Sequence, residues 1–262
     1  YRLNNNSINL INVEYNTNKA FNKISKKSNS FIRKSFDIAY HIIESGFSNK
    51  LINGPISKKS FLEKKFLGIT EYLAKRSEVK KVSMLIYNKK LSVCPVTTHL
   101  PLKKVIKKIT FKQISQNILL IDKFYKSYRK IKPRMAILGL NPHCESTDNY
   151  NEDEKIIKKT VNHYLKLGFK ISGPIPADTV FLKNIRKNYD VIIGMYHDQV
   201  LTPIKTIYEY DAINITLGLP YLRISPDHGP NEKMLGKNKS NPLSLIQAIN
   251  FLDKNWSKQK KV

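Results

Sequence analysis

The order of apolar and polar positions along the chain predicts an alternation of helices and strands. From Phe31 to Phe47 apolar side chains recur every three to four residues, which places them on one face of a helix. Similar helical patterns predict five later helices, over residues 102–109, 111–128, about 153–167, about 179–187 and 243–253. Between them, Ser57 is placed to cap a helix that runs through Phe66.

Short apolar runs of the kind that form strands lie between these helical patterns. They cover residues 51–52, 82–87, 91–96, 135–140, 170–175, 191–196 and 213–217, and a further patch at 8–13 indicates a strand in the polar N-terminal stretch. The runs 82–87 and 91–96 flank Asn88-Lys89-Lys90 and predict a hairpin. Such an alternation is typical of the α/β class, in which ligands bind at the carboxyl ends of strands.

Length and composition set the size and class of the molecule. At 262 residues and 41% hydrophobic content, the chain is long enough for one large α/β domain or two small lobes. It has no apolar run of about 18 residues and no signal-peptide pattern, so we expect a cytoplasmic protein without a membrane partner. Cys94 and Cys144 are far apart in the sequence, and we expect free thiols.

The formal net charge of +26 raises the question of nucleic-acid binding. A nucleic-acid face requires clustered cations, whereas the lysines are spread along the whole chain, mostly on the polar faces of amphipathic segments. This distribution favours a solvated basic surface, with no nucleic-acid partner and with a secondary attraction for anionic substrates.

Four histidines follow predicted strands in short polar segments: His99, His143, His197 and His228. Imidazole nitrogens suit Zn²⁺, Co²⁺ and similar ions, and three protein ligands leave a coordination position free for a substrate. The pattern therefore predicts a metal that acts as a Lewis acid on a substrate hydroxyl.

Polar side chains near these histidines predict an anionic substrate. Lys205, Asn214 and Arg223 offer a point charge, an amide and a bidentate fork for acidic groups. Asp178 and Asp198 are candidates for orienting a histidine or assisting proton transfer, and Asp178 is equally well placed to cap the helix that follows it.

The cofactor site is not of the conventional Rossmann type, since no Gly-x-Gly-x-x-Gly turn is present. The stretch Asp227-His228-Gly229-Pro230, followed by Leu235-Gly236-Lys237 and Asn241-Pro242, is a glycine-containing loop that is suited to lie against a dinucleotide.

Six motifs, in one order over residues 45–250, resemble the signature of the 4-hydroxythreonine-4-phosphate dehydrogenase family of vitamin B6 synthesis. They are Gly54-Pro55-Ile56-Ser57-Lys58, Thr97 to Leu102, Gly139 to His143, Gly173 to Thr179, Tyr196 to Gln199, and Asn214 to Gly229. The resemblance implies that residues 1–262 form one two-lobed α/β/α unit like the isocitrate and isopropylmalate dehydrogenases. It also implies a homodimer with an active site shared between the subunits.

The resemblance assigns roles by position. His99, His143 and His197 match metal ligands that come from both subunits, for Zn²⁺, Mg²⁺ or Co²⁺. Substrate-binding positions match Thr70, Lys205, Asn214 and Arg223; the cofactor segment, for NAD or NADP, matches His228, Gly229 and Asn241. Asp178, Asp198 and Lys205 are the catalytic candidates. The implied reaction oxidises 4-phosphooxy-L-threonine to 2-amino-3-oxo-4-phosphooxybutanoate, which decarboxylates to 3-amino-2-oxopropyl phosphate, in pyridoxal phosphate synthesis.

This sequence departs from the family pattern at several places. Ile69 stands where the family has a substrate-contacting histidine, Val200 where it has a glycine, and Pro230-Asn231 where it has Thr-Ala. The family's Gly-Asp-Pro-Ala-Gly-Ile-Gly-Pro-Glu segment does not occur, which implies that a first strand and part of the cofactor cleft are missing. Three alternatives stay open: a related dehydrogenase of phospho-threonate, phospho-erythronate or a cyclic diol acid, an inactive truncated homologue, and a basic nucleic-acid-binding protein.

Overall fold

The computed structural model describes residues 3–256 other than 5, 19, 64, 148 and 149. Its described part contains one eight-stranded mixed sheet in the order β1-β8-β7-β2-β3-β6-β4-β5. The strands are β1 (Lys50–Ile52), β2 (Ser83–Tyr87), β3 (Ser92–Thr97), β4 (Met135–Leu138), β5 (Ile171–Ile175), β6 (Val191–Tyr196), β7 (Ile213–Leu217) and β8 (Leu222–Pro226).

Strand direction brings three histidine-bearing loops to one edge of this sheet. β3, β6, β4 and β5 run parallel, so His99, His197 and His143 all follow the carboxyl ends of neighbouring strands. β2 is antiparallel to both β3 and β7, and the predicted hairpin is confirmed by the pairing of Ile86 with Val93. β8 is antiparallel to β7 and parallel to β1.

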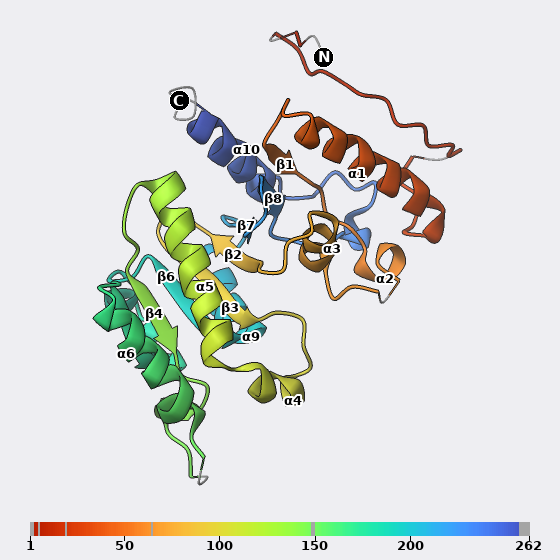
Figure 1. The fold of residues 1–262 in the computed structure, drawn as a ribbon. Coiled ribbons are helices and arrows are strands. Elements are labelled where there is room, and N and C mark those ends of the chain that lie inside the picture. The colour runs from red at the N-terminus through yellow and green to blue at the C-terminus, as the bar shows by residue number, and fades with distance from the viewer. Residues whose placement is uncertain (1–2, 5, 19, 64, 148–149, 257–262) are drawn as a thin grey trace.

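Helices cover both faces of the sheet (Figure 1). They are α1 (Asn29–Glu44), α2 (Lys58–Phe61), α3 (Ile69–Arg76), α4 (Leu102–Val105), α5 (Phe111–Phe124), α6 (Lys159–Lys166), α7 (Ala177–Val180), α8 (Lys183–Arg186), α9 (His197–Tyr208) and α10 (Leu243–Trp256). Buried apolar side chains of α5, α6 and α10 form one core layer with alternate residues of the strands. The other strand face packs on α9 and on the region of α7 and α8.

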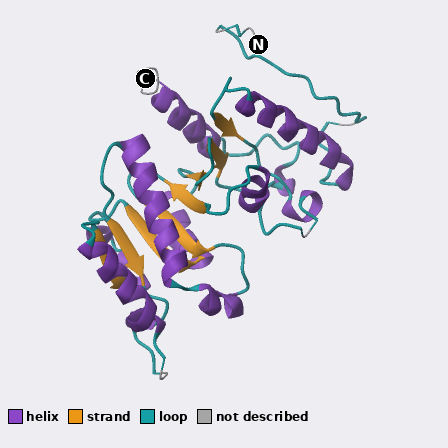
Figure 2. Ribbon diagram, viewed as in Figure 1, coloured by secondary structure: helices purple, strands orange, loops and turns teal. Residues whose placement is uncertain are grey.

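A third apolar cluster lies at the β1 end of the sheet, where α1, α2 and α3 group together (Figures 1 and 2). Phe36, Tyr40 and Leu73 pack there against Tyr221, which precedes β8. This cluster fixes the short α2 and α3 beside the ends of the central strands. No helix in the part of the chain that the structure describes is long and apolar enough to cross a membrane.

Several predicted elements differ from the structure. Residues 8–13 form no strand; Ile8 is 94% exposed, and an apolar run gains strand structure only by pairing with a neighbour. The helix after Ser57 ends at Phe61, and the helix expected near 179–187 is the two short helices α7 and α8.

The sequence patterns also missed three elements, α3, α9 and β8. α9 begins with the polar residues His197 and Asp198 and contains Pro203, which hide its helical periodicity.

Candidate functional site

Most of the residues predicted to act on a substrate gather in one pocket of about 290 Å³. Of the twelve candidates, eight line it: Thr70, His99, His197, Lys205, Asn214, Arg223, His228 and Gly229. They come from α3, from the loop after β3, from α9, from β7 and β8, and from the loop after β8. Segments distant in the sequence thus converge on one cavity, which we call the histidine pocket.

Two imidazoles stand together in the histidine pocket. The ring centroids of His99 and His197 are 5.6 Å apart. His197 begins α9, and its Nδ1 lies 2.7 Å from the carboxylate of Asp198. That hydrogen bond orients the ring and leaves Nε2 of His197 free, as in the carboxylate–histidine pairs of metal sites. Asp198 is thus placed to orient a histidine, and that role, one of the two considered for it from the sequence, stays a prediction.

His99 is held as a neutral imidazole. Burial lowers its pKa to about 4, and the nearby charges of Lys58 and His197 add to the effect. The ammonium of Lys58 donates to Nε2 of His99 at 2.7 Å. Nδ1 of His99 is buried and has no hydrogen-bond partner, and the same is true of Oε2 of Glu71. A neutral ring with a lone pair is the form that binds a metal.

The donors of this chain fit a divalent metal in part. His99 and His197 are suitable ligands, but the described residues contain no group of three His, Cys, Asp or Glu side chains arranged to hold an ion. His143 lies in the turn after β4, with a backbone φ of 55°, exposed and outside the histidine pocket. One chain therefore supplies two of the three predicted ligands to this pocket.

Arg223 brings an uncompensated positive charge to the pocket wall. It is 3% exposed, and burial lowers the pKa of its guanidinium to about 10. Its Nε donates to Oδ1 of Asn53 at 2.7 Å, and its Nη1 donates to Oγ1 of Thr216 at 3.0 Å. Among the described residues no carboxylate forms an ion pair with it. A buried cation without a counter-ion attracts an anionic ligand.

Lys205 and Asn214 differ in whether their polar groups are free to bind a substrate. Lys205 forms an ion pair with Asp227, with Nζ 2.7 Å from Oδ2, so its charge is already compensated. Burial raises the pKa of Asp227 and outweighs the lowering effect of Lys205. Asn214 Oδ1 is buried without a hydrogen-bond partner and is therefore a free acceptor for a substrate hydroxyl or ammonium.

Four predicted residues do not line the histidine pocket: Asp178, Asp198, Asn241 and His143. Asp178 is the second residue of α7, and the residue that precedes this helix is Pro176, so the predicted capping role is wrong. Asp178 lies near Cys144, whose pKa burial raises to about 11 with added effects from Asp153 and then Asp178. Asn241 accepts a hydrogen bond from the backbone N–H of Leu243 at the start of α10.

Sequence reasoning missed Lys58 and Asn53 as members of the site. Asn53 lies in the loop that links β1 to α2, directly before the Gly54-to-Lys58 motif, and Lys58 ends that motif as the first residue of α2. The motif indicated that this segment is important. Lys58 itself was not singled out, because lysine is abundant throughout the chain.

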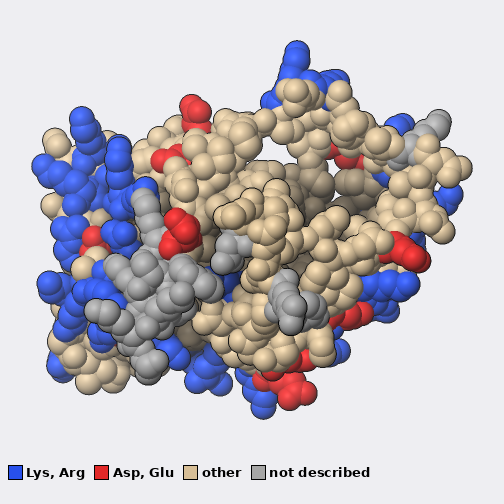
Figure 3. Space-filling model, turned by 90° about the horizontal axis from the view of Figure 1, so that it is seen from above, with Lys and Arg blue, Asp and Glu red and all other residues tan. Residues whose placement is uncertain are grey.

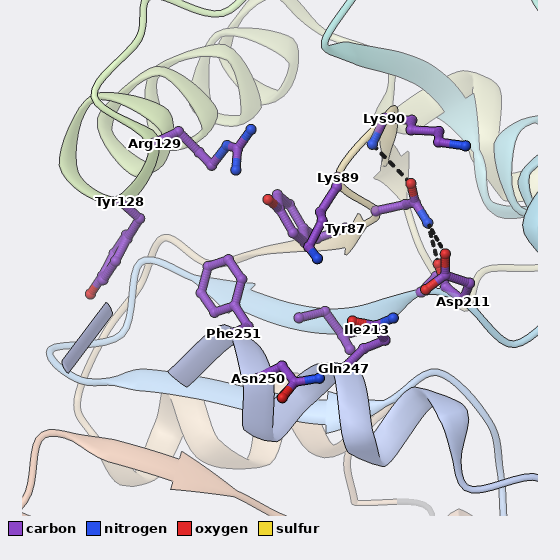
Figure 4. Close-up of a pocket in the computed structure, with 12 residues that line it drawn as sticks. Tyr87, Lys89, Lys90, Tyr128, Arg129, Asp211, Ile213, Gln247, Asn250 and Phe251 are labelled. Carbon is purple, nitrogen blue, oxygen red and sulfur yellow. Dashed lines mark hydrogen bonds between the residues drawn. The ribbon is translucent and has the colours of Figure 1, made fainter. Parts of the chain in front are cut away.

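A second hollow of about 230 Å³ lies on the opposite sheet face, between the turn after β2, the helical turn that follows α5, and α10 (Figure 4). Tyr87 and Phe251 form part of its apolar wall, and Asp211 is held there by Asn88. None of the twelve candidates lines it.

Figure 3 shows Lys and Arg gathered mainly at the left edge and lower rim of the face in view, around a largely uncharged centre.

Comparison with known proteins identifies relatives over most of the chain. The family described as "Pyridoxal phosphate biosynthetic protein PdxA" matches residues 2–252. A 4-hydroxythreonine-4-phosphate dehydrogenase from Sulfurihydrogenibium sp. is 43% identical over 77% of this chain and 63% of its own length. A D-threonate 4-phosphate dehydrogenase from Pectobacterium atrosepticum is 33% identical over 81% of this chain and 68% of its own length. The chain thus spans about two thirds of these relatives.

Solved structures agree with the expected fold. A putative 4-hydroxythreonine-4-phosphate dehydrogenase from Salmonella typhimurium superposes with a TM-score of 0.75 at 30% identity, over 88% of this chain and 72% of that one. A β-decarboxylating dehydrogenase from Thermococcus kodakarensis shares the fold alone, with a TM-score of 0.51 at 13% identity, over 79% and 65% of the two chains.

Proposed function

The chain belongs to the PdxA family of pyridoxal phosphate biosynthetic proteins, and from that premise we propose that it is a metal-dependent, NAD(P)-linked dehydrogenase of a phosphorylated four-carbon hydroxy acid. The proposed substrate is 4-phosphooxy-L-threonine, which the named function of the Sulfurihydrogenibium relative supports. The observation that carries the proposal is the meeting of His99 and His197 with the uncompensated cation Arg223 in one pocket.

In this proposal each side chain has a distinct task. Arg223 binds an acidic group of the substrate through its guanidinium fork, and Asn214 Oδ1 accepts a hydrogen bond from a substrate donor. Asp198 keeps the proton of His197 on Nδ1, so that Nε2 faces the pocket as a ligand. When bound, a divalent metal and a nicotinamide would supply Lewis acidity at the substrate hydroxyl and a hydride acceptor. Loss of hydride and proton gives a β-keto acid, which releases carbon dioxide.

The remaining candidates have subsidiary places in the proposal. Lys205 positions Asp227 at the pocket rim, and the loop with His228 and Gly229 extends from that rim toward Asn241 as the cofactor segment. Thr70 adds a hydroxyl to the same pocket for the substrate.

A related substrate, D-threonate 4-phosphate, is the second candidate. Ile69 lines the pocket where the family pattern has a histidine, and its side chain offers no hydrogen bond to the phosphate that both candidates carry. The relative from Pectobacterium atrosepticum is named for this substrate. The two phospho-acids differ in the group on the carbon next to the carboxylate, an ammonium in one and a hydroxyl in the other.

Turnover tests both candidates. We expect purified protein to form NADH or NADPH from one phospho-acid, with activity lost on chelation and restored by Zn²⁺, Mg²⁺ or Co²⁺. The His197→Ala variant should lose turnover, while His41→Ala, which changes a histidine of α1 outside the pocket, should retain it. Chelator-resistant turnover or an active His197→Ala variant would contradict the proposed chemistry.

We further propose that His143 and Asp178 serve the site of a second copy of the chain in a homodimer. Mixing two inactive variants tests this: in a His143→Ala/His197→Ala heterodimer one site keeps both histidines. Random mixing should restore about a quarter of wild-type activity, since about half of the dimers are mixed and one of their two sites is intact. If the three histidines act within one chain, no mixture regains activity.

A further inference from the structure

Lys58 enters the histidine pocket from a rigidly placed position. It is the first residue of α2, directly after Ser57, whose hydroxyl accepts from the backbone N–H of Ser60. Phe61 anchors this short helix in the apolar cluster around α1. The ammonium of Lys58 reaches Nε2 of His99 at 2.7 Å and forms no ion pair in the described part of the chain.

The contact to His99 occupies an atom that a metal would need. An ammonium has three donors and no lone pair, so Nε2 of His99 is the acceptor and its single lone pair is used. A metal bound through Nε2 uses the same lone pair. The Lys58 contact and a metal bond at this atom therefore exclude each other.

The other ring nitrogen offers no alternative. Nδ1 of His99 is buried, and it lies on the side of Gly68, where a Cβ would be 3.3 Å from Nδ1 and 2.9 Å from Oε2 of Glu71. With Nε2 as the acceptor, the proton of the neutral ring is on Nδ1, on the side of the ring that faces Gly68. His99 therefore presents Nε2 to the pocket.

A displaced Lys58 would remain in the pocket as a free cation. Lys205 is already paired with Asp227, whereas Lys58 forms no ion pair among the described residues. Burial lowers the pKa of Lys58, and the charge of the Glu71 carboxylate opposes this effect without an ion pair. Ile69, on the same wall, offers no hydrogen bond to an anion. Ile69, which lacks a polar group, thus lines the same pocket as a lysine that metal binding would release.

We propose that Lys58 exchanges partners, holding Nε2 of His99 when no metal is bound and binding an anionic group of the substrate once a metal takes that atom. The inference rests on the proposed function for the metal and for the identity of the anion, whereas the contact between Lys58 and His99 is observed. Metal and substrate would then bind in favoured order, because the metal frees the cation that the substrate needs.

The first experiment measures Zn²⁺ affinity of the metal-free, substrate-free protein by competition with a chromogenic chelator. Lys58→Met removes the donor while keeping a side chain of similar length, and we expect Zn²⁺ to bind roughly 3- to 30-fold more tightly, as expected for loss of one competing hydrogen bond. Lys59→Met, which changes the neighbouring lysine outside the pocket, should leave the affinity unchanged. In a His99→Ala background the gain from Lys58→Met should vanish. An equal or weaker affinity in Lys58→Met would overturn the exchange.

The second experiment measures binding of 4-phosphooxy-L-threonine and D-threonate 4-phosphate to the zinc-loaded protein by calorimetry. Lys58→Met should weaken binding of the phospho-acid about tenfold or more, and Lys58→Arg should recover part of the loss. Unchanged binding in Lys58→Met would overturn the substrate half of the proposal. A wild-type protein that binds neither acid refutes the proposed function instead, while the Zn²⁺ measurement still decides the exchange at His99.

Discussion

Replacing Arg223 by methionine should separate stability from ligand binding. Arg223 is 3% exposed and forms no ion pair among the described residues, so the folded chain carries a buried charge. Burial lowers its pKa from 12.5 to about 10, and at pH 7 the group is charged in both the folded and the unfolded chain. The shift therefore corresponds to about 3 kcal/mol of destabilisation of the folded state. Removing the charge relieves this cost.

Two hydrogen bonds oppose that gain. The guanidinium donates to Asn53 at 2.7 Å and to Thr216 at 3.0 Å, and bonds from a charged donor contribute roughly 1.5–3 kcal/mol each. The gain and the loss are of similar size. We therefore expect Arg223→Met to change the free energy of unfolding by less than about 2 kcal/mol, far less than the roughly 3–5 kcal/mol typical of breaking a buried ion pair.

Urea denaturation with and without ligand provides the assay. Wild-type protein with metal and substrate at about 100 times its dissociation constant should gain about 2.7 kcal/mol, and Arg223→Met should show almost none of this gain. Arg33→Met, which changes an exposed arginine of α1, serves as the matched control and should behave as wild type. Destabilisation of more than about 4 kcal/mol, or full ligand stabilisation in Arg223→Met, would refute the reasoning.

Three further predictions concern the scaffold and the metal. Gly194→Ala places a Cβ 2.5 Å from a methyl group of Val200, so we expect roughly 1–3 kcal/mol lower stability by thermal denaturation, whereas Gly54→Ala, with open space around it, should change little. Burial raises the pKa of Asp190, but hydrogen bonds from Arg134 outweigh it and lower the pKa below 3.8. This stabilisation is present above the unfolded pKa and lost as pH falls through the folded pKa, so Arg134→Met should flatten the stability profile below about pH 4. Dialysis against chelator should lower the melting temperature, and added Zn²⁺ should restore it, as fluorimetry can show.

The sequence predicted the site better than the helices that carry it. His99 was predicted because it follows a predicted strand in a short polar segment, and Asn214 and Arg223 because they are polar groups that accompany the histidines; the sheet order then brings all three to one pocket. The helix that carries His197 was missed because its first turn is polar and it contains a proline. Local periodicity reports burial of one face, so it fails where a helix begins with residues that face a ligand.

Other features depended on contacts that no local pattern records. The strand expected at 8–13 required a partner strand, which the described chain does not provide. Lys58 is one of many lysines, and only the packing of α2 against α1 brings it to His99. Composition shows that lysines are abundant but not which lysine contacts His99, because that contact depends on the folded structure.

The position of His143 follows from sheet order and from one buried carboxylate. β4 lies beyond β6 from the pocket, whose other walls come from β2, β7 and β8, so the turn after β4 starts on the far side of His197. Asp153 is fully buried and accepts the backbone N–H groups of Leu140 at 2.6 Å and of Asn141 at 3.1 Å, which fixes the start of that turn. A turn held in this way cannot swing His143 back across a strand without breaking both bonds. If His143 is a ligand, it therefore serves the pocket of another chain, and the exposed side chain is already free to do so.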